Sequence, residues 1–228
     1  MGEGNDADRS VLQTMEIGSQ ADLRRGRSQL RRLETLTDVV YGIAIWRVFM
    51  LFPRPDDPAW NWHSWREFLV SEGMTIVLIA IAVAVLIIYW LQSNTLFGLA
   101  DRADGKFAVR AIVQLFFVLL FLFSIRVGTE LPASAWTRGF ESVAALLLGL
   151  SSTWMWTYAA ERRRLLHADV TDAEARAVGK RIRAEPATAM FTLPFVFTPI
   201  LWELAWFSYP AVRRFFRKQA RRIAGNSE

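Results

Sequence analysis

The sequence predicts an all-α integral membrane protein with six transmembrane helices. Hydrophobic residues make up 53% of the 228 residues, and the mean hydropathy of +0.20 is high for a soluble domain. These residues gather in long apolar blocks such as 74–91 and 111–125, whereas the charged residues lie mostly between the blocks. This is the distribution expected when lipid, rather than a folded core, surrounds much of the chain.

The basic residues alternate between successive connections. The segment before the first apolar block is basic, as are the second and fourth connections and the C-terminal segment, whereas the first and third connections hold few basic residues. Positively charged loops stay in the cytoplasm, so this pattern predicts cytoplasmic N- and C-termini and an even number of spans. The basic positions include Arg24, Arg25, Arg31, Arg102, Lys106, Arg110, Arg176, Lys180, Arg213, Arg214 and Arg217.

The net charge of +5 and the isoelectric point of about 10.1 raise the question of which partner the basic residues bind. Because these residues flank apolar blocks, we expect anionic lipids on the cytoplasmic side as partners and no nucleic acid, at roughly 1 kcal/mol per basic residue near the surface. The chain has no cysteine, and its two histidines, His63 and His167, are too few for a histidine metal cluster. No nucleophile–base pair or phosphate-binding glycine loop is present, so we expect no enzyme activity, no metal site and no cofactor.

Three segments are expected along the chain. Residues 1–30 are expected to form a disordered or loosely helical cytoplasmic leader without the apolar region of a signal peptide, 31–218 the six-helix domain, and 219–228 a basic cytoplasmic tail. A single span over 187–209 would place the basic tail outside, so Pro199 is expected to divide two helices. The six helices are expected at about 33–52, 71–97, 107–127, 138–160, 172–197 and 199–218.

The segment 32–38, RLETLTD, opens the first predicted helix. It resembles the R-x-x-x-F-S-D signature of the transmembrane protein 175 family of lysosomal and bacterial potassium channels, with Leu36 and Thr37 in place of phenylalanine and serine. The segment 89–97, YWLQSNTLF, resembles the family's Y-W-x-x-H-H-x-L-F motif, although Ser93 and Asn94 replace the histidines. With the proline-broken last helices, the resemblance covers residues 31–217.

Charged residues at the mouth of a membrane helix are costly unless they are paired or hydrogen-bonded. In the family, a polar network at this place holds the pore-lining helix to its neighbours. The resemblance therefore implies a network formed by Arg32, Leu36, Thr37, Asp38, Trp90, Ser93 and Asn94. The alternative is that Arg32 is one of many cytoplasmic anchors and that Asp38 is a charge favoured by the helix dipole.

The resemblance also implies a homo-oligomer, expected to be a tetramer, with the first helix around a central path for a monovalent ion. Counting from Asp38, the lining positions are Ile43, Arg47 and Met50, and a ring of Ile43 side chains would form a hydrophobic constriction. Trp46 and Arg47 depart from the family, which has threonine and leucine there. An arginine ring would repel potassium by about 4 kcal/mol at a separation of about 4 Å and an effective dielectric near 20.

Several functions remain open on this basis. The first is a potassium-permeable channel in a bacterial plasma membrane. The alternatives are a non-conducting or regulatory membrane protein of the same fold, its axis blocked by Trp46 and Arg47, and an anion-selective pore. If Arg47 does not face the axis, it is expected to pair with Glu203 or to extend to the outer headgroups.

Overall fold

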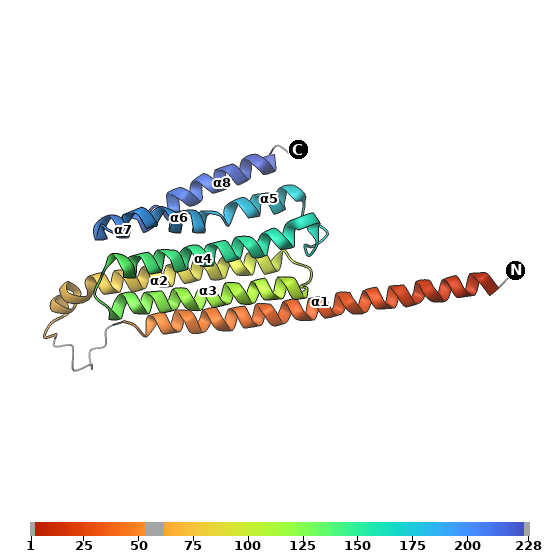
Figure 1. Cartoon of the computed structure of the whole chain (residues 1–228), viewed down its shortest axis with the longest axis horizontal. Coiled ribbons are helices and arrows are strands. Elements are labelled where there is room, and N and C mark those ends of the chain that lie inside the picture. Colours follow the sequence, from red (N-terminus) through yellow and green to blue (C-terminus); the bar gives the residue numbers. More distant parts are fainter. Residues whose placement is uncertain (1–2, 53–61, 226–228) are drawn as a thin grey trace.

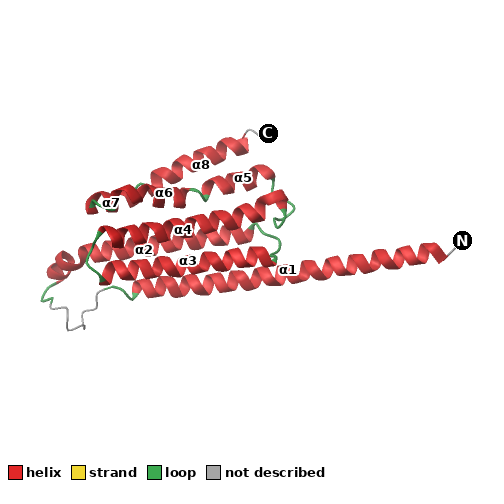
Figure 2. Cartoon of the chain, viewed as in Figure 1, coloured by secondary structure: helices red, strands yellow, loops and turns green. Residues whose placement is uncertain are grey.

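The structure is a computed structural model that describes residues 3–52 and 62–225. Within these ranges every regular element is a helix, in agreement with the predicted class (Figure 2). The elements are α1 (Glu3–Phe49), α2 (Trp65–Gly98), α3 (Gly105–Glu130), α4 (Ala135–Ala160), the 3₁₀ turn η1 (Glu161–Arg163), α5 (Asp172–Arg181), α6 (Ala184–Thr192), the 3₁₀ turn η2 (Leu193–Phe195), α7 (Pro199–Trp206) and α8 (Tyr209–Gly225).

Side-chain caps set the starts of the long helices. Ser64, Asp104 and Ser134 each accept a hydrogen bond from a backbone N–H in the first turn of α2, α3 and α4. Ser134 and Thr137 satisfy each other's backbone as a capping box. Because these caps lie in polar sequence, each helix begins earlier than the hydropathy predicts.

The helices form two layers (Figure 1). Helices α1 to α4 lie side by side along the long axis, with α1 packed on α2 and α3, and α3 packed on α4. The second layer contains α5 to α8 and contacts α4 mainly through α6. Helix α8 returns along α5, so the chain leaves the bundle at the end where α1 enters it.

Ser142 of α4 joins the two layers near the turn between α6 and α7. Its buried hydroxyl accepts hydrogen bonds from Thr192 Oγ1 of α6 and Trp202 Nε1 of α7, each at 2.8 Å. The chain reverses here at Thr198 and Pro199, the position at which the sequence predicts the last two helices to separate.

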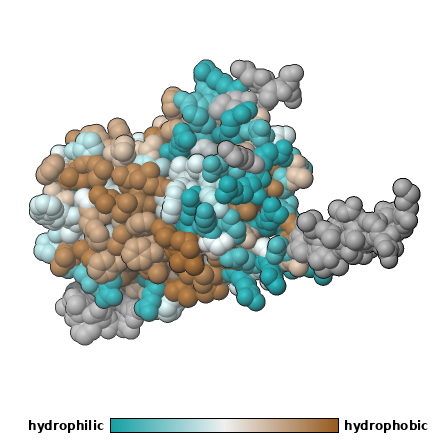
Figure 3. Space-filling model, turned by 45° about the vertical axis from the view of Figure 1, so that its right-hand side comes forward, coloured by the Kyte–Doolittle hydropathy of each residue, from teal (hydrophilic) through white to brown (hydrophobic). Residues whose placement is uncertain are grey.

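Three helices in the described residues are long and apolar enough to cross a membrane: the part of α2 from Thr75 to Gly98, α3, and α4. The space-filling view shows brown apolar residues over one part of the surface and teal polar residues toward the end where α1 extends (Figure 3). The spans expected in α1 and in residues 172–218 stay predictions.

The structure describes most of the expected leader and tail as helix. Residues 3–30 belong to α1, the helical one of the two forms expected for the leader, and they contain no proline to end a helix. This part of α1 is also held to the bundle, because the Arg27 guanidinium donates two hydrogen bonds to Asp101 Oδ1, at 2.8 and 3.0 Å. At the other end, α8 continues past the expected boundary at 218 to Gly225, and 226–228 lie outside the described residues.

The last two expected helices are each broken once more. The continuous helix expected over 172–197 is wrong, because α5 ends at Arg181 and α6 begins at Ala184. Pro186 has no N–H to donate to the carbonyl of Ile182, which explains this break. In the same way Pro210 cannot donate to the carbonyl of Trp206, the last residue of α7.

Candidate functional site on the first helix

Helix α1 packs on the bundle through one face. Within the part expected to cross the membrane, the buried residues recur every three or four positions, which is the period of one side of a helix. They are Leu33, Thr37, Tyr41, Ala44 and Val48.

The opposite face of α1 is apolar and exposed. Its residues recur at alternating intervals of three and four, the spacing by which helices pack along a seam. Ile43 is 53% exposed and Trp46 is 55% exposed, although both are large apolar side chains. We call this surface the α1 stripe; it consists of Leu36, Val39, Ile43, Trp46 and Met50.

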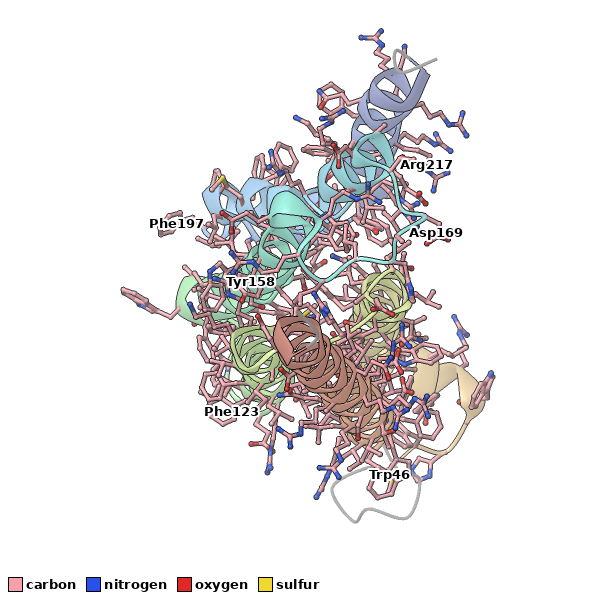
Figure 4. The ribbon with its side chains drawn as sticks, turned by 90° about the vertical axis from the view of Figure 1, so that its right-hand side faces the viewer. Trp46, Phe123, Tyr158, Asp169, Phe197 and Arg217 are labelled. Carbon is pink, nitrogen blue, oxygen red and sulfur yellow. The ribbon has the colours of Figure 1, made fainter. Side chains whose placement is uncertain are left out.

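The α1 stripe lies on the side of α1 that points away from the second layer. Looking along the bundle, Trp46 lies at its edge beneath α1, far from Phe197 and Arg217 of the second layer (Figure 4). Because the described part of the chain leaves these side chains exposed, lipid or another copy of the protein is expected to cover them.

Arg47 lies on the flank of the α1 stripe that faces α3. Its guanidinium carbon is 5.9 Å from the centroid of the Trp46 ring. Together with Leu119, Leu122 and Phe123 of α3, it lines an open cavity of about 470 Å³. In the described chain Arg47 forms no ion pair, and the pairing with Glu203 considered from the sequence is absent.

The Arg126–Glu130 pair closes the same cavity near the C-terminal end of α3. Arg126 Nε donates to Glu130 Oε1 at 2.7 Å, and both side chains are largely exposed. Arg47 of α1 thus lines the same cavity as Arg126 of α3, and Arg126 already has Glu130 as its acidic partner.

Asp38 and Trp90 meet as the resemblance implies. Trp90 Nε1 of α2 donates a hydrogen bond of 2.8 Å to Asp38 Oδ1 of α1. The carboxylate therefore has a donor from a neighbouring helix, and Thr37 beside it is buried on the packed face of α1.

One helical turn along α2, a second set of polar groups connects α2, α3 and α4. Gln114 Nε2 donates to Ser93 Oγ at 3.0 Å and to Ser152 Oγ at 2.9 Å, and all three side chains are buried. The Tyr41 hydroxyl of α1 is buried beside Ser93 and Gln114 without a hydrogen bond of good geometry. We call Asp38, Trp90, Ser93, Gln114 and Ser152 the polar ladder.

The polar ladder differs from the expected network in its membership. Arg32, Leu36 and Asn94 are exposed in the single chain and have no hydrogen bond to it among the described residues. Gln114 and Ser152 were missed by the sequence analysis. The available signal was Gln114 itself, the one strongly polar side chain in the middle of an apolar block.

Solved structures share this arrangement of helices. A lysosomal potassium-selective channel TMEM175 homolog from Chamaesiphon minutus matches with a TM-score of 0.67 at 18% identity, over 85% of this chain and 99% of its own. A single-residue variant of the potassium channel MtTMEM175, solved in complex with a nanobody–MBP fusion protein, matches with a TM-score of 0.58 at 16% identity, over 84% of this chain and 93% of its own.

No family model matches the sequence, and no curated protein matches it closely enough to serve as a relative. At identities of 16–18% the structural matches establish the fold, and they cover nearly the whole length of both neighbours. The protein therefore has the fold of the TMEM175 potassium channel homologues.

Proposed function

We propose that the protein is an oligomeric, potassium-permeable channel in which the α1 stripe lines the ion path. The observation that carries the proposal is the stripe itself, a row of exposed apolar side chains on the face of α1 turned away from its own bundle. In a closed ring of copies, this face would surround the axis and Ile43 would form a hydrophobic constriction.

The polar ladder supports the proposal from the other side of α1. A pore-lining helix has to keep its rotation about its own axis while ions pass, and Asp38 is tied to Trp90 one turn below Tyr41. The tetramer, the monovalent ion and the bacterial plasma membrane belong to the same proposal, on the strength of the fold shared with potassium channel homologues.

Potassium flux into liposomes tests the proposal. The wild-type protein is expected to conduct, and Ile43→Asn is expected to raise the flux severalfold, because a polar ring lowers the cost of wetting an apolar constriction. Ile112→Asn on α3 is the matched control, since Ile112 is 52% exposed and Ile43 is 53% exposed. An inert wild-type protein in correctly assembled form would overturn the proposal.

A second candidate is a non-conducting or regulatory protein of the same fold. Trp46 favours it, because this large ring lies within the α1 stripe next to Ile43, with Arg47 at its flank. Potassium flux that is absent in the wild type and is restored by Arg47→Leu or Trp46→Thr would support this candidate. An anion-selective pore would instead give reversal potentials that follow a chloride gradient.

A further inference from the structure

A crevice separates α2 from the second layer on the side of the bundle away from the α1 stripe. Its polar part is lined by Gln92 of α2, by Arg181 of α5 and Glu185 of α6, and by Arg213 and Arg217 of α8. Its apolar part has a cavity volume of about 210 Å³. The two parts adjoin, since Ile88 and Glu185 line both.

The polar part has an excess of positive charge. Arg181, Arg213 and Arg217 form no ion pair in the described chain, and Glu185 is the single acidic residue among the lining side chains. The Glu185 carboxylate is engaged by Tyr209, whose hydroxyl donates to Oε1 at 2.9 Å. The crevice is therefore suited to a negatively charged group.

Several buried polar atoms of the crevice have no hydrogen-bond partner among the described residues. Both amide atoms of Gln92 are buried and unpaired, as are Glu185 Oε2 and Trp206 Nε1. An unpaired buried polar group costs free energy. A cluster of such groups is therefore expected where a bound ligand supplies the missing partners.

The crevice also has the depth of one leaflet. Its polar part lies near the end of α2 at Gln92, whereas the apolar part reaches Ile81, so it runs about 16 Å along the helix. Half of a hydrocarbon core is about 15 Å. The deeper part is lined mostly by apolar residues, including Val85, Ala189 and Pro210.

We propose that this crevice binds one anionic phospholipid, with its phosphate at Arg181, Arg213 and Arg217 and one acyl chain in the apolar cavity. Gln92 Nε2 then donates to a phosphate or glycerol-ester oxygen. Basic clusters between membrane helices bind anionic headgroups in this way. The site is independent of the proposed conduction, because lipid binding is measured without an ion gradient.

Native mass spectrometry of the full chain in detergent tests this site, with phosphatidylglycerol and phosphatidylcholine of identical acyl chains as probes. We expect one phosphatidylglycerol per chain to be retained in preference to phosphatidylcholine. The double variant Arg213→Gln/Arg217→Gln is expected to weaken phosphatidylglycerol binding about 30-fold. Its matched control is Arg221→Gln/Arg222→Gln, which removes the same charge from the same helix outside the crevice.

Ala84→Phe tests the acyl-chain cavity separately, because Ala84 lines only its apolar part. It is expected to weaken the binding of both lipids while the preference for phosphatidylglycerol remains. If the Arg213/Arg217 and Arg221/Arg222 double variants weakened phosphatidylglycerol binding equally, the proposal would be overturned. Helix α8 would then attract anionic lipid through its overall charge and not through the crevice. Competition by inorganic phosphate, together with no effect of Ala84→Phe, would also overturn it in favour of a free-anion site.

Discussion

Asp38 and Trp90 provide the sharpest residue-level test of how α1 is held. Trp90→Phe removes the indole donor and is expected to lower the free energy of unfolding by about 1.5–3 kcal/mol, the usual range for a hydrogen bond to a charged group. In an Asp38→Asn background the same change should cost less. A double-mutant cycle, measured by reversible unfolding in mixed micelles, gives the coupling free energy between Asp38 and Trp90.

Trp206→Phe is the matched control for that cycle. Among the described residues the Trp206 Nε1 atom is buried without a partner, so its removal breaks no hydrogen bond within the described chain and should show no coupling to Asp38. Equal coupling of Asp38 to both tryptophans would mean that the measured effect comes from general packing.

The sequence predicted part of this residue-level detail. Asp38, Trp90 and Ser93 stood in two short motifs, and the structure places all three in the polar ladder. Gln114 and Ser152 could not be paired in advance, because which polar side chains meet depends on the relative rotation of α3 and α4. Hydropathy gives the length of a span but not its rotation.

Among the helices, Gly149 of α4 allows the close approach of α6. A Cβ added there would lie 2.7 Å from Pro186 Cδ, 2.8 Å from Pro186 N and 2.9 Å from the Tyr89 hydroxyl oxygen. The proline ring and backbone cannot give way as a flexible side chain would. We therefore expect Gly149→Ala to lower the free energy of unfolding by about 1–3 kcal/mol, measured in the same mixed micelles.

Gly139→Ala on the same helix is the control, because nothing lies within 4 Å of the Cβ that it adds. It should leave stability unchanged or raise it by up to about 1 kcal/mol, since alanine favours a helix more than glycine does. If Gly149→Ala were as stable as Gly139→Ala, the α4–α6 contact would have to be looser than the structure shows.

The elements also show where sequence reasoning fails. Helices α2, α3 and α4 were predicted from apolar blocks, and their caps account for the differences at their starts. The breaks before Pro186 and Pro210 were missed, because the prediction considered only prolines near the middle of the apolar stretch 187–209, such as Pro199. The form of residues 3–30 was left open between disordered and loosely helical, because polar composition alone does not distinguish a solvated helix from a disordered segment.

At the scale of the whole molecule, both ends of the chain leave the bundle on one side and the α1 stripe faces away from the second layer. The alternation of basic loops predicted the first feature. Composition and periodicity alone could not predict the second, because it depends on which face of α1 the other helices cover, although the family resemblance had put Ile43 and Met50 on the lining face. Both features are needed for a ring of copies with α1 inside and the basic segments on one side of the membrane.

Disulfide cross-linking tests that ring directly, since the chain contains no cysteine that would interfere. If α1 surrounds the axis, Ile43→Cys brings identical thiols from different copies together, and an oxidant in the membrane should yield covalent dimers. Ile112→Cys, equally exposed on α3, should yield far fewer. The measurement is the dimer fraction on a non-reducing gel, and dimers from Ile112→Cys alone would place α3, not α1, where copies meet.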